Sequence, residues 1–577
     1  MKAFRFTLLF VMTAVLCGCQ AFVNYKFLPR EGVRPAEYAV SVDRDISIIT
    51  SDGVELLASV YRPKVDGRTP TILVRIPVSK TWKNDMAMEA VASFWAGRGY
   101  TVVIQGTRGR YRSGGEFYPL RSERQDGIET LQWLARQPWF DGRLGMWGGS
   151  AFGYTQWVLA DQPGVLALNI QIASTDFGTM FHPGGAFSLE SALFWAVRSR
   201  GKEDEDPSFQ ALEKGFNGFP LIEADDRAVG DIPFFNDWAT AQPGSAYWTS
   251  IDGTDRAANA RAPVLLMAGW SDPFLPTQLR DFMSLQHSSI GRVAQDSRLI
   301  IGPWTHADPI IFPDGLAPES YRAASLAPSI PWFDHHLLGQ PLAATLNAPV
   351  RLYVMGENVW RDEPAWPLAR ARHTAFYLQG DGKANGLQGD GKLLPDLPVK
   401  ALKDSYRYDP AHPVPSRGGA MLGPRAGMVK QNDVEIRSDV LVYSTPPLVE
   451  EVEVTGPISA ILFVQTSASN TDFTVKLVDV HPDGAAYNIS DGILRRSYAA
   501  NSDPSEITVE LWPTSMLFKR GHQIRVEISS SNFPRYDRNP NTGRDILNEV
   551  SPVVANQTLH HSPVMPSRII LPVIPRK

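Results

Sequence analysis

Cysteine is nearly absent from this 577-residue chain, which has only Cys17 and Cys19, both near its N-terminus. We therefore expect no disulfide, no thiol nucleophile and no zinc site of the cysteine type in the remaining sequence. A chain of this length can bury enough apolar surface to fold without disulfides, and it is long enough for two or more domains.

The chain also lacks an excess of positive charge. It has 56 Lys and Arg against 61 Asp and Glu, a formal net charge of -5 and a pI near 6.2. Proteins that bind nucleic acids favour a strong basic excess, so no nucleic-acid partner is expected. Aromatic residues, in contrast, are plentiful (15 Trp, 17 Tyr and 27 Phe), which predicts aromatic-rich cores and pockets.

The N-terminal apolar run, residues 6–16, is shorter than the roughly 20 residues that a membrane-spanning helix needs. With Lys2 and Arg5 before it, the run is typical of an export signal. The sequence LCGC that follows resembles a bacterial lipobox, in which Cys19 would carry the lipid. We expect residues 1–18 to be a lipoprotein signal peptide and the protein to be held at the outer membrane by its lipid alone. The alternative is a cleaved signal and a soluble periplasmic or secreted protein.

Between about residues 40 and 345, short runs rich in Val, Ile and Leu alternate with amphipathic stretches. This order favours a mostly parallel sheet with helices on both faces, that is, an α/β domain. From about 177 to 260 the rhythm breaks into helical segments and loops, which predicts a helical cap inserted over the sheet. Strands are predicted at 71–78, 100–107, 143–150, 165–174, 262–272 and 298–306, and helices at 86–100 and 126–140.

The composition changes after this domain, and we assign residues 346–577 to a second domain. Its apolar runs are short, alternate with polar residues and are divided by turn residues, which is typical of an all-β sandwich. Such runs occur at 350–356, 375–380, 460–468, 473–484, 507–513 and 522–531.

Residues 145–157 read GMWGGSAFGYTQW and place Ser150 between a predicted strand and a predicted helix. A sharp strand-to-helix turn exposes its central residue and needs small neighbours, which Gly148, Gly149 and Gly153 supply. The N-terminus of the helix would offer N–H groups to a developing anion. Taken alone, the pattern also fits a glycine-rich connection without any chemical role.

Two later residues give Ser150 a chemical context. Asp272 and His306 each end a predicted strand, so both fall at the carboxyl edge of the sheet, like Ser150. A serine hydroxyl needs a base to take its proton, and an imidazole base needs an acid to fix its tautomer. The order Ser, Asp, His is that of an α/β-hydrolase. Singly, Asp272 could cap the next helix and His306 could be a loop histidine, but together they predict a catalytic triad.

These stretches, WGGSAFGYTQW, AGWSDPF and IGPWTH, resemble the motifs of the CocE/NonD hydrolase family, which includes X-Pro dipeptidyl-peptidases and cocaine esterase. Further matching stretches lie at 104–117, 489–495 and 529–543, so the resemblance covers nearly the whole chain.

The resemblance implies an α/β-hydrolase domain over 40–345 with its helical cap, followed by a C-terminal jelly-roll β-sandwich. By motif it places the nucleophile at Ser150, the acid at Asp272 and the base at His306.

The sequence departs from this family pattern around the oxyanion site. Ala151 follows the serine where the family usually has Tyr, although its backbone N–H should still donate to the oxyanion. Val78 stands where the family has a tyrosine whose hydroxyl is the second donor; Ser79 or a backbone N–H could replace it. Gly106 stands where an aspartate is common, which puts the support of Arg108 in doubt.

We expect a serine hydrolase that cleaves an ester or amide bond through an acyl-enzyme and needs no metal or organic cofactor. Its substrate would be a small ester, an amide or a short peptide; no oligomeric state is predicted. The stretch FHPGGAF (181–187) is expected to line an apolar pocket, with His182 more often structural than catalytic. The alternative is a weakly active or inactive surface lipoprotein that binds a partner on the hydrolase scaffold.

Overall fold

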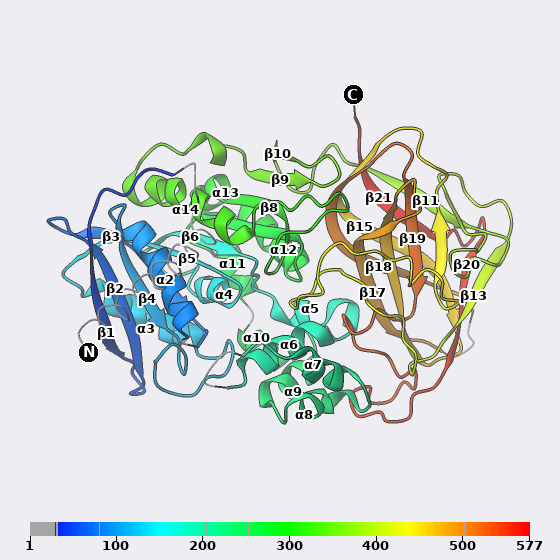
Figure 1. The fold of residues 1–577 in the computed structure, drawn as a ribbon, viewed down its shortest axis with the longest axis horizontal. Coiled ribbons are helices and arrows are strands. Elements are labelled where there is room, and N and C mark those ends of the chain that lie inside the picture. Colours follow the sequence, from blue (N-terminus) through cyan, green and yellow to red (C-terminus); the bar gives the residue numbers. More distant parts are fainter. Residues whose placement is uncertain are drawn as a thin grey trace, which may run out of the picture.

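Two β-sheets, with helices between and around them, make up the described part of the chain (Figure 1). The computed structural model describes residue 29 and residues 33–79, 81–201, 205–251, 253–499 and 503–576. The expected signal peptide, residues 1–18, and the expected lipidation residue Cys19 lie outside these ranges.

The first sheet has the strand order β1-β2-β4-β3-β5-β6-β7-β8-β9-β10. From β4 to β9 neighbouring strands are parallel, and antiparallel pairs lie at the two edges. The strands are β1 Val40–Ile49, β2 Glu55–Pro63, β3 Thr69–Ile76, β4 Thr101–Gly106, β5 Phe140–Gly149, β6 Val165–Gln171, β7 Val264–Ser271, β8 Arg298–Thr305, β9 Val350–Val354 and β10 Val359–Glu363.

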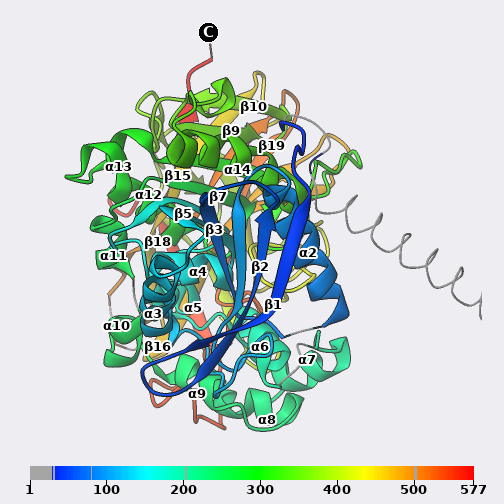
Figure 2. The same cartoon turned by 90° about the vertical axis from the view of Figure 1, so that its left-hand side faces the viewer.

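Helices cover both faces of this sheet, as predicted, and Figure 2 shows α2 and α3 on opposite sides of the strands. Because successive side chains of a strand point to opposite faces, Ile72 and Val74 of β3 join the apolar cluster under α2 and α14, whereas Leu73 joins the other cluster. The helices are α2 Trp82–Ala96, α3 Glu123–Ala135, α4 Ala151–Trp157, α12 Leu275–Gln286, α13 Gly291–Asp296 and α14 Tyr321–Leu338.

The cap is helical, as predicted, and lies between the first sheet and the second (Figure 1). Its core is aromatic: Trp238 stacks on Phe181 with ring centroids 4.8 Å apart and on Trp195 at 4.7 Å. The cap helices are α5 Phe177–Phe181, α6 Leu189–Ser199, α7 Phe209–Phe216, α8 Ala224–Ala228, α9 Pro233–Thr240, α10 Ala246–Ile251 and α11 Thr254–Ala258.

The C-terminal jelly-roll β-sandwich is built from strands β11 to β21, with β15 at its centre pairing with β18, β20 and β21. Its strands are β11 Arg372–Gln379, β12 Lys392–Leu394, β13 Leu402–Tyr408, β14 Leu441–Ser444, β15 Val452–Thr466, β16 Asn470–Val480, β17 Ala486–Ser497, β18 Ser505–Phe518, β19 Gln523–Ser529, β20 Ala555–His561 and β21 Arg568–Ile574. No helix in the described ranges combines the length and the apolar character needed to cross a bilayer.

The structure corrects one expectation about the second domain. The run 350–356 was assigned to the sandwich, but β9 pairs in parallel with β8, and β10 pairs with β9, so both strands extend the first sheet. Alternation of apolar and polar residues predicts a strand without saying which sheet it joins, and for this reason the run was placed in the wrong sheet.

The sandwich packs directly against the first domain. One apolar cluster runs without interruption from the first sheet through the cap into the sandwich. Backbone hydrogen bonds join the two parts as well: Met355 N–H donates to Ser515 (3.0 Å), and Leu517 N–H donates to Met355 (2.8 Å). The described chain therefore has one continuous core under two sheets.

Candidate active site

Ser150 occupies a strained turn between β5 and α4. Its backbone has φ 57° and ψ -130°, a left-handed conformation that L-residues rarely adopt. Two neighbours must be glycine for steric reasons: a Cβ at Gly148 would lie 2.5 Å from the Cβ of Phe152, and one at Gly153 would lie 2.6 Å from the Cβ of Ala173. At Gly149 the nearest contact would be 3.3 Å, so the need for a small residue is weaker there than the sequence argument assumed.

Ser150, Asp272 and His306 meet at the carboxyl edge of the first sheet. His306 Nε2 lies 2.9 Å from Ser150 Oγ, and His306 Nδ1 lies 2.6 Å from Asp272 Oδ2. With Nδ1–H donating to the carboxylate, Nε2 carries the lone pair that accepts the serine hydroxyl proton. The three residues are far apart in sequence and follow three different strands, yet their side chains form one hydrogen-bonded chain.

Both oxygens of the Asp272 carboxylate accept hydrogen bonds. Asp272 is fully buried, and its second oxygen, Oδ1, accepts a hydrogen bond from Phe274 N–H at 2.8 Å. The alternative that Asp272 caps the next helix is not met, because α12 begins at Leu275 without a side-chain cap; Oδ1 instead closes the turn that precedes this helix. The indole Nε1 of Trp512, from the sandwich, donates to the Asp272 carbonyl at 3.2 Å.

The predicted oxyanion residues lie on two sides of Ser150. Ala151 is the first residue of α4 and lines the pocket at Ser150; N–H groups in the first turn of a helix have no acceptor within the helix. Val78 also lines this pocket. Ser79 is 1% exposed and is not among the lining residues, and its carbonyl accepts a hydrogen bond from the Asn84 side chain.

The doubt about Arg108 has a structural answer. A side chain at Gly106 would meet the Arg110 carbonyl oxygen at 2.6 Å, so this position has no room for the aspartate of the family pattern. Arg108 is instead held by two other carboxylates, Asp126 at 2.7 Å and Asp52 at 2.7 Å. Arg108, in the turn after β4, is therefore held without an aspartate at position 106.

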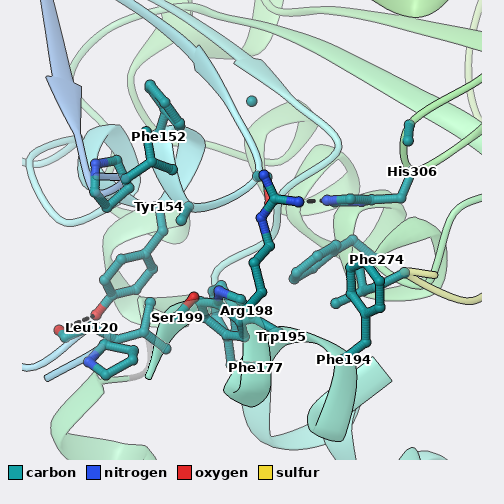
Figure 3. A pocket seen from close by; sticks show the side chains of 18 of the residues that line it. Leu120, Phe152, Tyr154, Phe177, Phe194, Trp195, Arg198, Ser199, Phe274 and His306 are labelled. Atoms are coloured by element: carbon teal, nitrogen blue, oxygen red, sulfur yellow. Dashed lines mark hydrogen bonds between the residues drawn. The ribbon is translucent and has the colours of Figure 1, made fainter. Parts of the chain in front are cut away.

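A pocket of about 280 Å³ lies over Ser150 and His306, between the sheet edge and the cap (Figure 3). Most of its wall is apolar, which suits an organic acyl or leaving group. Its Phe, Trp and Tyr members are Phe117, Phe152, Tyr154, Phe177, Phe194, Trp195, Phe274 and Tyr321. Leu422, from the C-terminal region, completes the wall, so both parts of the chain shape the pocket.

Five polar residues that line the pocket were not singled out from the sequence: Glu123, Tyr154, Arg198, Ser199 and Tyr321. Figure 3 shows Arg198, at the end of α6, extending from the cap toward His306; its guanidinium also contacts Asp206. Tyr321 opens α14 and lines the pocket. Burial raises the pKa of the Glu123 carboxyl, against the opposing charge of Arg75, which lies 3.1 Å away. The sequence offered a signal for Arg198 alone, because it is an arginine within a predicted cap helix.

The stretch 181–187 does not line this pocket among the described residues, contrary to our expectation. Phe181 faces inward, where it stacks on Trp238 in the cap core. The Nε2 of His182 bonds the Trp238 carbonyl at 2.7 Å, and burial lowers the pKa of this imidazole to about 4. His182 is therefore a buried, neutral part of the cap and not a residue of the pocket.

Comparison with known proteins agrees with this architecture. Residues 52–308 match the family model described as X-Pro dipeptidyl-peptidase (S15 family), and residues 343–570 match the X-Pro dipeptidyl-peptidase C-terminal non-catalytic domain. The cocaine esterase of a Rhodococcus species is 37% identical over 586 residues, covering 93% of this chain and 99% of the esterase. The chain belongs to the CocE/NonD hydrolase family.

Solved structures show the same fold. An aminopeptidase from a marine sediment Thaumarchaeota archaeon superposes with a TM-score of 0.79 at 24% identity, covering 95% of this chain and 99% of that one. An α-amino acid ester hydrolase superposes with a TM-score of 0.76 at 24% identity, covering 94% and 98%. These structures share the α/β-hydrolase domain, the helical cap and the jelly roll. The family match and the similarity to cocaine esterase make this CocE/NonD protein an enzyme of the serine hydrolase type.

Proposed function

We propose that this CocE/NonD hydrolase cleaves carboxylic esters, with Ser150 as nucleophile, His306 as general base and acid, and Asp272 as the acid that orients the imidazole. The observation that carries the proposal is the unbroken chain of two hydrogen bonds, 2.9 Å and 2.6 Å long, that joins these side chains. Ser150 lines an apolar pocket, so a substrate carbonyl that enters this pocket can reach the serine hydroxyl.

The reaction would proceed by acyl transfer to water. His306 takes the Ser150 proton through Nε2 while the hydroxyl oxygen attacks the carbonyl carbon. The imidazolium is stabilised by Asp272 and returns its proton to the leaving alkoxide, so that an alcohol departs and an acyl-serine remains. Water, deprotonated by the same imidazole, then attacks the acyl-serine; the imidazolium gives this proton to the departing Ser150 oxygen, so the carboxylic acid is released and the free enzyme is regenerated.

The oxyanion would accept hydrogen bonds from the Ala151 N–H and from a second donor. Ser79, or a backbone N–H beside it, remains the prediction of the sequence analysis. The pocket adds Tyr321 as a third candidate, since it lines the same pocket as Ser150 and Val78 and its phenol can donate a hydrogen bond. Removing the true donor should reduce turnover by about 10²–10³-fold, so separate Ser79→Ala and Tyr321→Phe variants would identify it.

Esters are favoured over free peptides by the charges of the pocket. Recognition of a peptide's N-terminal ammonium requires an available carboxylate, but Glu123 is paired with Arg75. Arg198 is the one arginine or lysine among the described lining residues. It also binds Asp206 at the surface, so a carboxylate in the acyl or alcohol part of an ester would share this guanidinium with Asp206 or displace it. Similarity to cocaine esterase over 93% of the chain also supports ester cleavage.

The experiment that tests the catalytic assignment is labelling by a fluorophosphonate probe. The wild-type protein should be labelled, and Ser150→Ala should abolish both the label and the hydrolysis of p-nitrophenyl esters. Ser199→Ala is a matched control because Ser199 also lines the pocket, and this variant should keep the label. A wild-type protein that is neither labelled nor active would favour the binding-protein alternative.

The choice between ester and amide needs a second assay. We expect p-nitrophenyl esters to be cleaved with a much larger kcat/KM than X-Pro or amino-acid p-nitroanilides. The reverse order of kcat/KM would make the protein a peptidase that uses the same three residues.

We further propose export and lipid attachment at Cys19, supported by the basic start, the apolar run and the lipobox-like LCGC. Expression of the full chain with radiolabelled palmitate should label the wild type but not Cys19→Ser. A wild-type protein that takes up no fatty acid and stays soluble without detergent would contradict the lipid anchor.

A further inference from the structure

A second group of reactive side chains lies in the jelly roll, outside the active-site pocket. Among the residues that the structure describes, Asp479, His481 and His522 are the one group of three His, Asp or Glu residues whose potential ligand atoms all lie within 4.8 Å of one another. Asp479 is 2% exposed and His481 27% exposed, so the group opens to solvent on one side.

The strand register explains why these three residues meet. β16 and β19 are antiparallel, with Asp479 opposite Ile524 and Val480 opposite Gln523. The next step along both strands puts His481, just after β16, opposite His522, just before β19. Residues two apart on a strand share a face, and directly opposite residues have neighbouring side chains, so Asp479 and both imidazoles lie on one face.

One of the two contacts has the dimensions of a metal coordination sphere, and the other is shorter. His522 Nδ1 lies 2.9 Å from Asp479 Oδ1, and His481 Nε2 lies 3.4 Å from Asp479 Oδ2. Ligands held at about 2.0–2.2 Å from a tetrahedral Zn²⁺ are separated by roughly 3.3–3.6 Å. The His481 separation lies in this range. The His522 separation is that of a direct hydrogen bond, so this imidazole would have to move about 0.4 Å away from the carboxylate to place all three atoms on one ion.

Another buried His–Asp pair in the same domain has a different environment. The Asp404 carboxylate accepts hydrogen bonds from the His561 ring, the Tyr443 hydroxyl and the Ala384 N–H. Two imidazoles, those of His481 and His522, contact the Asp479 carboxylate. Asp479 with its two imidazoles offers three potential ligand groups within 4.8 Å of one another, whereas the Asp404–His561 pair offers two.

We propose that Asp479, His481 and His522 bind one divalent transition-metal ion of the zinc class. Two imidazole nitrogens and one carboxylate oxygen suit Zn²⁺ or Co²⁺, whereas Ca²⁺ and Mg²⁺ prefer oxygen ligands alone. Asp314 and Asn358 line the same cavity, of about 180 Å³, and could complete the coordination directly or through water.

The site lies between the sandwich and the segment that follows β8. Phe312, Pro313 and Asp314 of this segment line the cavity together with the three ligands. A bound ion would therefore stabilise the contact between the jelly roll and the chain that leads from His306 toward α14. Its role is structural, and ester hydrolysis does not require it.

The test uses the full chain without a histidine tag. After equilibrium dialysis against Zn²⁺ and elemental analysis, the wild type should retain one ion per chain, and Co²⁺ should give the visible absorption of a low-coordinate site. His481→Gln and His522→Gln should each weaken Zn²⁺ binding at least tenfold. His412→Gln should not, although His412 lies 3.3 Å from Asp409, because this pair is exposed and has no second imidazole.

A readout besides binding separates loss of the site from loss of the fold. Zn²⁺ should raise the Tm of the wild type and of His412→Gln, but not that of His481→Gln or His522→Gln, while Ca²⁺ and Mg²⁺ should leave every Tm unchanged. Without metal, all variants should unfold cooperatively near the wild-type Tm. Absence of Zn²⁺ binding by the wild type, or equal binding by the folded His481→Gln and His522→Gln variants, would overturn the proposal.

Discussion

The hydrolase domain and the jelly roll use their polar residues differently. In the hydrolase domain, Ser150, Asp272 and His306 follow parallel strands; Ser150 and His306 line an open pocket, and the buried Asp272 supports His306 from behind. In the jelly roll, charged residues are buried in pairs: Arg495 binds both Asp472 and Asp537, each at 2.7 Å. The first arrangement exposes reactive groups to a substrate, whereas the second fixes backbone segments to one another.

The stretches that resemble the family divide along the same line. Those around Ser150, Asp272 and His306 supply the side chains of the candidate site. Those at 489–495 and 529–543 meet in the jelly roll, where Arg495 binds Asp537, and the Phe187 N–H of the cap donates to the Asp537 carboxylate at 3.1 Å. Similar motifs in a family therefore mark either the chemistry or the packing of the domains, and the contacts distinguish the two.

The largest expected effect comes from removing the jelly roll. A chain ending at residue 363, after β10, would expose the apolar cluster that the two parts share and would lose the contact of Trp512 with the Asp272 carbonyl. We expect it to be insoluble or to lack a cooperative unfolding transition by calorimetry. A soluble truncated chain with unchanged Tm and esterase activity would show that the domains are independent.

Within the hydrolase domain, Asp272→Asn should reduce kcat by about 10⁴-fold, because an amide at this position favours the wrong histidine tautomer. Since the substitution keeps the size of the side chain, the Tm should change little. Ester hydrolysis and thermal unfolding are measured on the same sample. A kcat within tenfold of the wild type would remove Asp272 from the mechanism.

Within the jelly roll we expect the reverse: a substitution should lower stability and leave kcat nearly unchanged. Arg495→Met leaves Asp472 and Asp537 as buried, unpaired carboxylates, which should lower the free energy of unfolding by about 3–5 kcal/mol. At temperatures where the variant is folded, kcat should stay near the wild-type value. The control is Arg496→Met, because Arg496 is exposed and its loss should cost less than about 0.5 kcal/mol. A large loss of kcat in folded Arg495→Met would contradict the view that Arg495 serves stability alone.

The smallest effect concerns the cap, which belongs to the hydrolase domain but also contacts the jelly roll. Arg198→Ala should lower kcat/KM about 10–100-fold for an ester with a carboxylate, since one charge-assisted hydrogen bond is lost. A neutral p-nitrophenyl ester of the same length should be affected less than threefold. Arg200→Ala, two residues further on and outside the pocket wall, should change neither rate. Equal losses for both esters in Arg198→Ala would assign it a structural role.

The architecture could be predicted because buried apolar runs that alternate with amphipathic stretches are typical of one kind of sheet. Buried runs such as 71–78 and 100–107 predicted β3 and β4, and the strand ends predicted that Ser150, Asp272 and His306 would share one edge. Sequence reasoning could not place 350–356, since strand alternation does not record the partner strand.

The pocket was harder to predict than the three side chains at its floor. Arg198 and Tyr321 enter it through the packing of the cap and of α14, which depends on contacts far apart in sequence. Likewise, His481 and His522 are 41 residues apart, and only the β16–β19 register brings them together.

The conformation of Ser150 has a consequence for how this enzyme can be stabilised. A left-handed backbone at a residue with a side chain costs about 1–3 kcal/mol, and the surrounding glycines do not remove that cost at φ 57°. Glycine at position 150 would relieve the strain but would abolish the nucleophile, so the most stable sequence at this turn is an inactive one. Selection for heat resistance without selection for activity would therefore favour loss of this serine.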